Sequence, residues 1–165
     1  GCRWPNRRRC SRRTPGDAPI VAVAVNLDDM TPELAEKLRR TALRILERSP
    51  DARLACLNVL RLNRIALDQT LDAEGNNKHV QRLVGLKDWA RPMALGAGRI
   101  TFHVLEAVDP AETILDYARV NNVDHIVMGA RANSAMRKLL GSVSGKVAAE
   151  APCSVTVVRN RAAEE

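Results

Sequence analysis

Short apolar runs alternate with amphipathic stretches along the chain, and this pattern predicts five strands. The first run, IVAVAV at residues 20–25, is continuous and rich in β-branched residues. Such runs are typical of strands that are buried on both faces of a parallel sheet. Similar runs predict the other four strands, at residues 53–60, 100–105, 125–128 and 154–158.

Apolar residues between these runs recur at helical spacing, and helix-start residues precede two of the stretches. Thr31-Pro32 supplies a hydroxyl cap and a proline, and Asp109-Pro110 with Glu112 resembles a capping box. We expect helices at residues 31–49, 78–90, 109–121 and 142–151, whereas residues 65–71 fit neither pattern. The residues placed on one face of their helix are Leu34, Leu38, Ala42 and Ile45; Val80, Leu83, Leu86 and Ala90; and Ala111, Ile114, Leu115 and Ala118.

Strands and helices alternate, and that order predicts an α/β fold of the doubly wound class: a five-stranded parallel sheet with helices on both faces. We expect one such domain, over residues 18–161. Sheets of this kind bind ligands at the carboxyl ends of their strands, where the strand order reverses. The loop after Val25, the strand end at Leu60 and the loop after Met128 are therefore expected on one rim.

The stretch at residues 123–144 combines a buried strand with two glycines and a helix start. Gly129 opens the loop after the strand, and Gly141 precedes the Ser-Val-Ser start of a new helix. Backbone N–H groups at a helix N-terminus are unpaired, and the helix dipole favours an anion there, so the stretch suits a phosphate. The alternative is an ordinary strand–loop–helix joint without a ligand, which is common in α/β domains.

The stretch from Gly129 to Ser144 resembles the glycine signature of the universal stress protein family, which runs G-x2-G-x9-G-S/T after the fourth strand. The closing sequence PCSVTVVR at residues 152–159 also resembles the last strand of that family. The chain has Ala132 in place of the second glycine, and the spacer before Gly141 is one residue shorter. A Cβ at Ala132 costs about 1 kcal/mol or more if that position needs a positive φ.

The resemblance spans residues 19–159 and implies the strand order 3-2-1-4-5 and binding of ATP or a related adenine nucleotide, with little or no hydrolysis. Asn26 stands where nucleotide-binding members carry an aspartate that contacts the adenosine, and Asp28 is a substitute two residues on. The backbone near Leu60 and Met128 is implied to flank the adenine. The residues implied to line the phosphate loop are Gly129, Arg131, Ala132, Gly141, Ser142, Val143 and Ser144.

The last predicted strand, Val155 to Val158, lies at the edge of the sheet in this strand order, where an apolar strand invites pairing. The resemblance implies that it pairs with its own copy in a homodimer. A second interpretation is a dimerisation or regulatory module without nucleotide, as in the universal stress protein A branch of the family. Some family members are fused behind a serine/threonine protein kinase, and the N-terminal residues are then the remnant of a linker.

The formal net charge of +7 lies mostly in one segment. Six arginines and one aspartate give residues 1–17 a charge of +5, so the rest of the chain carries +2. Two prolines and few apolar residues predict that this tail is disordered. It is interpreted as a linker, and the alternative is an arm that binds nucleic acid.

Other candidate chemistry is sparse. Asp28-Asp29 is open to two interpretations, ligands of a Mg²⁺ ion bound to phosphates or acidic residues that favour the next helix N-terminus. The histidines His79, His103 and His125 are dispersed and the four cysteines lack metal-ligand spacing, so we expect structural roles and no metal site. No apolar run approaches the length of a membrane span, and a reducing cytoplasm is the expected location.

Overall fold

The five predicted strands form one parallel sheet in the order β3-β2-β1-β4-β5, which confirms the expected order 3-2-1-4-5. The computed structural model describes residues 18–28, 30–61, 77–130 and 142–159. Central strand β1 pairs with β2 on one side and with β4 on the other, and its residue Val23 lies between Cys56 and Val127. The strands are β1 (Ile20–Ala24), β2 (Arg53–Arg61), β3 (Ile100–Ala107), β4 (His125–Gly129) and β5 (Ser154–Val158).

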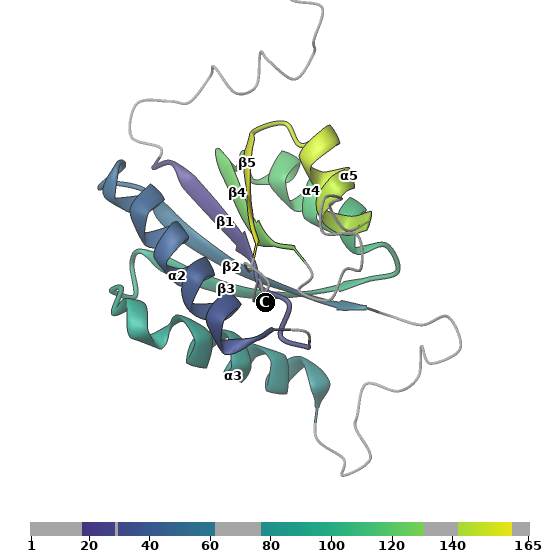
Figure 1. Cartoon of the computed structure of the whole chain (residues 1–165), viewed down its shortest axis with the longest axis horizontal. Coiled ribbons are helices and arrows are strands. Elements are labelled where there is room, and N and C mark those ends of the chain that lie inside the picture. The colour runs from purple at the N-terminus through teal and green to yellow at the C-terminus, as the bar shows by residue number, and fades with distance from the viewer. Residues whose placement is uncertain (1–17, 29, 62–76, 131–141, 160–165) are drawn as a thin grey trace, which may run out of the picture.

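Helices cover both faces of the sheet, as the doubly wound class requires (Figure 1). Two long helices lie on one face and two shorter ones on the other, and a single 3-10 turn, η1 (Arg91–Met93), follows the second long helix. The helices are α2 (Pro32–Glu47) and α3 (Lys78–Ala90) on the first face and α4 (Pro110–Val120) and α5 (Ser142–Glu150) on the second.

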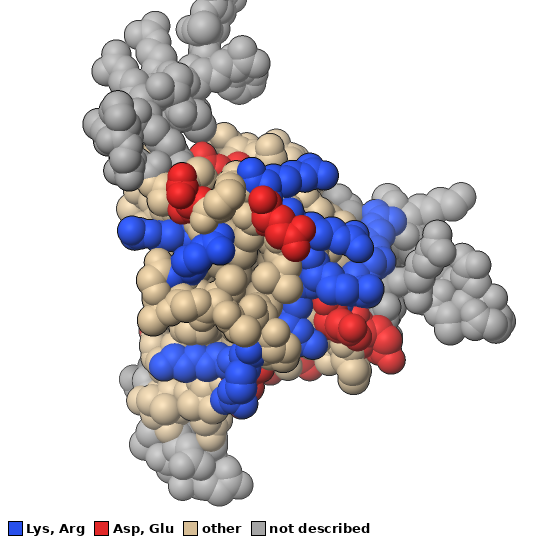
Figure 2. Space-filling model, turned by 90° about the vertical axis from the view of Figure 1, so that its left-hand side faces the viewer, with Lys and Arg blue, Asp and Glu red and all other residues tan. Residues whose placement is uncertain are grey.

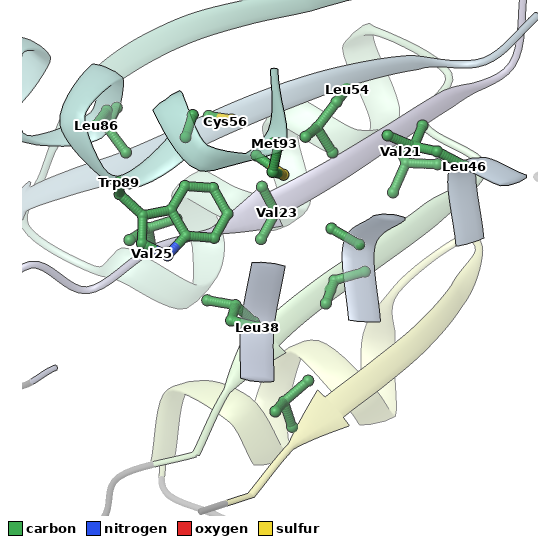
Figure 3. Close-up of a cluster of buried hydrophobic side chains, with 14 of the residues drawn as sticks. Val21, Val23, Val25, Leu38, Leu46, Leu54, Cys56, Leu86, Trp89 and Met93 are labelled. Atoms are coloured by element: carbon green, nitrogen blue, oxygen red, sulfur yellow. The ribbon is translucent and has the colours of Figure 1, made fainter. Parts of the chain in front are cut away.

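The core on the α2–α3 face is built from large side chains (Figure 3). Leu38 is fully buried against the sheet, and Trp89 fills the space between α3 and α2. The indole Nε1 of Trp89 donates a hydrogen bond to the carbonyl of Ala35 at 3.2 Å, so its polar atom is satisfied. Fully burying one such apolar side chain contributes about 1.5–3 kcal/mol, which explains why the amphipathic pattern of α2 fixes its position.

The core on the α4–α5 face contains many small residues. Ala22 and Ala55 on the strands meet Ala111 and Ala118 of α4, with the larger Leu115 fully buried among them. The buried set of α4 is the predicted set, because its cap and apolar spacing are both strong local signals. Asp109 caps the helix, and its Oδ1 accepts a hydrogen bond from the backbone N–H of Glu112.

The predicted apolar face of α3 is wrong at its first turn. Val80 was placed beside Leu83 and Leu86, but 54% of it is exposed. At the 3.6 residues per turn of an α-helix, Val80 stands about 120° around the helix from Leu86. The residues of α3 that are buried are Leu86, Trp89 and Ala90, so the helix packs through its C-terminal half.

Smaller corrections concern element ends. Strand β3 continues two residues past the predicted end, to Ala107.

Cys153 precedes β5 and is half-buried, whereas Cys56 is buried within β2; both are free cysteines. Among the described helices, none is both long and apolar enough to cross a membrane.

The surface charge of the described domain is mixed. Figure 2 shows basic side chains interspersed with acidic ones on one side of the molecule. The outer face of α2, for example, exposes Arg40, Arg44 and Arg48 together with Glu36 and Glu47. The arginine-rich residues 1–17, like residues 160–165, lie outside the described residues.

Candidate functional site

The carboxyl ends of β1 and β4 lie next to each other, at the point where the strand order reverses. Ala24 of β1 is in register with Met128 of β4. The chain leaves β1 towards α2 on one face of the sheet, and α5, which comes after β4 in the chain, lies on the opposite face (Figure 1). This divergence is the topological switch point at which sheets of this class bind ligands. A ligand of this domain is therefore expected at this rim.

The loop after β1 carries Asn26 and Asp28, and both are exposed. The Oδ1 of Asn26 accepts a hydrogen bond from the backbone N–H of Asp28 at 3.1 Å. The carboxylate of Asp28 forms an ion pair with Arg82 of α3, with 2.8 Å between Oδ1 and Nη1. Asp28 therefore already has a cationic partner, whereas the amide nitrogen of Asn26 has no bond within the described residues.

Asn58 of β2 is a residue that the sequence analysis missed. It holds the start of the loop after β1 through a buried hydrogen bond. Its side chain is 1% exposed, and its Nδ2 donates a hydrogen bond to the carbonyl of Val25 at 2.8 Å. The backbone N–H of Val25 in turn donates to the carbonyl of Leu57 at 2.8 Å. The signal was a single polar residue within the apolar run of β2, RLACLNVLR, because a buried polar side chain needs a specific partner.

Leu60 and Met128 do not meet through their side chains. Leu60 is partly buried and packs against the core on the α2–α3 face. Met128 is 4% exposed and belongs to the core on the α4–α5 face. The two side chains thus point to opposite faces of the sheet, and the expectation that the backbone near them flanks an adenine stays a prediction.

Gly129 ends β4 and lies against the side chain of Leu34 from α2. A Cβ at this position would lie 3.3 Å from Leu34 Cδ2, so a side chain here would press on α2. The next backbone N–H, that of Ala130, donates to the carbonyl of Val158 at 2.9 Å and is thereby bound to β5. Arg131, Ala132 and Gly141 of the predicted phosphate loop lie outside the described residues.

Helix α5 begins at Ser142, which is exposed, and continues with Val143 and Ser144. Val143 packs against the core on the α4–α5 face, and Ser144 is 4% exposed. Of these three residues, Ser142 is the one whose side chain is exposed and available to a ligand, whereas Val143 and Ser144 are turned towards the protein interior.

Lys146 ties α5 to the start of α4. Its Nζ lies 3.1 Å from Glu112 Oε1 and 3.5 Å from Asp109 Oδ2. The hydrogen bond that Lys146 donates to Glu112, with the charges of both carboxylates, raises the pKa of Lys146. The hydrogen bond from the backbone of Glu112, followed by the nearby Lys146, lowers the pKa of the Asp109 carboxyl group. These charges hold the two helices together and do not point to chemistry.

Histidine side chains near the strands have local partners. A ring nitrogen of His125 lies 2.7 Å from the hydroxyl of Thr156, and one of His103 lies 3.0 Å from that of Thr101. Burial lowers the pKa of both histidines. Within the part of the chain that the structure describes, no three or more His, Cys, Asp or Glu residues are grouped to hold a metal ion.

Comparison with protein families identifies the fold's relatives. The model of the universal stress protein family matches residues 20–159. The chain belongs to the universal stress protein family. A universal stress protein of Methanothermobacter thermautotrophicus is 45% identical over 56 residues, and one of Thermus aquaticus is 55% identical over 51 residues. These matches span 38% and 37% of the two relatives.

Solved structures of family members share the fold over most of this universal stress protein. A universal stress protein from Archaeoglobus fulgidus has a TM-score of 0.61 and 24% identity, and the match covers 86% of this chain and 98% of that one. UspA from Lactobacillus plantarum is 27% identical, with a TM-score of 0.54 over 87% of this chain and all of that one. A family member from Arabidopsis thaliana, solved with AMP bound, has a TM-score of 0.59, 17% identity and coverage of 88% and 94%.

Proposed function

We propose that this universal stress protein binds ATP or a related adenine nucleotide in the cytoplasm during a stress response, with little or no catalysis. The observation that carries the proposal is the switch point, where the carboxyl ends of β1 and β4 meet beside Gly129. An adenine nucleotide is the ligand because the chain belongs to this family and a member from Arabidopsis thaliana is solved with AMP bound.

The proposed ligand lies across the two crossovers that leave β1 and β4. Asn26 contacts the nucleoside through its amide, and the phosphates lie at the N-terminus of α5 near Ser142. The dipole of α5 and the backbone N–H groups of its first turn favour an anion there. Gly129 ends β4 between these two crossovers, and the space that its missing side chain leaves is occupied by Leu34 of α2. Arg131 then supplies positive charge, and Mg²⁺ accompanies the phosphates in this proposal.

Isothermal titration of the whole chain with Mg-ATP tests the proposal. We expect a heat of binding and a rise in the melting temperature at millimolar ATP, because a ligand that binds the folded state stabilises it. Ser142→Asp places a negative charge beside the phosphates and should abolish the heat. The matched control is Ser154→Asp, at an exposed serine on the amino end of β5. If neither the wild type nor Ala132→Gly binds Mg-ATP, the proposal is rejected.

The second candidate function is a nucleotide-free dimerisation or regulatory module. It is favoured by β5, which is the edge strand of the described sheet and carries half-buried Val155 and Val157. An unpaired edge of this kind can extend the sheet into a second copy. Analytical ultracentrifugation together with the Mg-ATP titration distinguishes the two candidates. A dimer that Val155→Lys dissociates, in a protein that shows no heat of binding with Mg-ATP, supports this module.

A further inference from the structure

Helix α3 contacts the loop after β1 through a glycine. Gly85 lies against the side chain of Leu27, and a Cβ at this position would lie 2.9 Å from Leu27 Cδ1. Ordinary contacts of a Cβ are longer than 3.4 Å, so Leu27 occupies the space that the missing side chain leaves. The loop is therefore seated directly on the backbone of α3.

Helix α3 also binds the next residue of the loop, Asp28. Arg82, one turn before Gly85, forms the 2.8 Å ion pair with Asp28. The guanidinium group is well covered, since 22% of the Arg82 side chain is exposed against 69% of that of Asp28. The backbone N–H of Asp28 donates to Asn26, so the ion pair is connected to the residue proposed to contact the nucleoside.

A buried hydrogen bond fixes the point where this loop leaves the sheet. Asn58 donates to the carbonyl of Val25, the residue just before Asn26. The loop is thus held at its first residue from β2, and at Leu27 and Asp28 from α3. Three contacts on consecutive parts of a short loop restrict it far more than one exposed ion pair would.

We infer that Arg82 and Gly85 of α3 are positioning residues of the nucleotide site: they hold the β1–α2 loop so that the amide of Asn26 is oriented before a nucleotide arrives. The inference rests on the proposed function and adds two residues of α3 to the residues that determine affinity. A loop that is already ordered loses less conformational entropy on binding, so its affinity for the nucleotide is higher. Arg82 and Gly85 act through Leu27 and Asp28 and need not touch the nucleotide.

The decisive variant is Gly85→Ala, because it is expected to move stability and affinity in opposite directions. Alanine favours a helix over glycine, and the tip of Leu27 can rotate away, so the melting temperature should stay the same or rise by about 2–4 °C. Without the contact between Leu27 and Gly85 the loop is held less firmly, so ATP binding should weaken about two- to ten-fold, the size expected when the order of about one side chain is lost. The matched control is Gly98→Ala, at a glycine whose Cβ would have nothing within 4 Å.

A second pair of variants tests the ion pair. Arg82→Gln should weaken ATP binding by about two- to five-fold, in the range of a partly exposed ion pair, and should speed hydrogen exchange at the amide of Asp28. The control is Arg91→Gln, which removes another arginine paired with an aspartate, Asp88, away from the loop. Asp28→Asn should weaken binding as Arg82→Gln does, and the double variant should be no weaker than either single one.

The outcomes separate this inference from the proposed function. If the wild type fails to bind ATP, the proposed function fails and the inference falls with it. If the wild type binds and both Gly85→Ala and Arg82→Gln bind equally well, the inference alone is overturned. A fall in melting temperature with unchanged affinity would give these residues a purely structural role and would also overturn it.

Discussion

The two faces of the sheet differ in how they reach the carboxyl rim. On the α2–α3 face, large side chains such as Leu38 and Trp89 form the core, and Asn58 and Arg82 fix the loop after β1. On the α4–α5 face the core is rich in alanine, and α5 presents its N-terminus at the rim while Lys146 ties it to α4. In the proposed nucleotide complex, the α2–α3 face would orient the nucleoside and the α4–α5 face would supply the helix dipole for the phosphates.

The largest expected effects lie in the two cores. Leu38→Ala on one face and Leu115→Ala on the other remove fully buried side chains. Each should lower the free energy of unfolding by about 2–5 kcal/mol, because the lost transfer energy adds to the cost of a cavity. Urea denaturation measures both. A much smaller loss for Leu115→Ala would show that the alanine-rich face can collapse around the cavity and that the two faces are not equally rigid.

Asn58→Leu tests the buried hydrogen bond between Asn58 and the carbonyl of Val25. It leaves the carbonyl of Val25 without its side-chain donor, and an unpaired buried polar group costs about 1–3 kcal/mol. The same change also removes the Oδ1 of Asn58, which has no donor among the described residues, so the loss should lie in the lower half of that range. Chemical denaturation gives the value. A variant as stable as the wild type would mean that Asn58 does not secure the loop.

The N-caps of α2 and α4 allow the same kind of interaction to be compared on the two faces of the sheet. Thr31 Oγ1 accepts from the backbone N–H of Leu34 at 3.2 Å, and Asp109 plays the same part for α4. Replacing either cap with alanine should cost about 1 kcal/mol. Asp109→Ala should cost somewhat more, since it also removes a partner of Lys146. Thermal unfolding at low and high salt distinguishes the two, because the Asp109 loss should shrink with salt and the Thr31 loss should not.

The smallest predicted effect is a pH dependence to which His125 and His103 both contribute. Burial lowers the pKa of each in the folded protein, so the unfolded chain binds the proton more readily. Stability should therefore fall as the pH drops below the ordinary histidine pKa of 6.5, until the lowered folded pKa is passed. Melting temperatures between pH 5 and 8 follow this slope. His125→Gln should reduce the slope and leave the part carried by His103, whose pKa burial also lowers, whereas the same substitution at the exposed His79 is the control.

The sequence predicted the elements where local signals agree. The five strands and the buried face of α4 follow from continuous apolar runs, a strong cap and regular spacing around Ile114 and Leu115, whereas the strand order was implied by the family resemblance. The prediction for the first turn of α3 was wrong because Val80 is an apolar residue at a helical position that faces solvent. Which side of a helix meets the sheet is decided by tertiary packing, and a single short apolar pattern carries little of that information.

The candidate site was predictable in part. Its place on the rim follows from the order of strands and helices, and Asn26, Gly129 and Ser142 are found there. The sequence did not reveal the pairing of Asp28 with Arg82 or the seat of Leu27 on Gly85. These contacts join residues more than fifty positions apart, and no local spacing encodes them. The Ala132 and spacer departures lie in residues outside those described.

The most direct test of the central claim is an ATP titration of the ¹⁵N-labelled protein, followed by amide chemical shifts. We expect concentration-dependent shifts at Asn26, Gly129 and Ser142 to Ser144, which lie on both crossovers of one rim. Amides at the amino ends of the strands, such as that of Arg53, should not move. If millimolar ATP leaves the Asn26 and Ser142 amides unchanged, the rim is not a nucleotide site.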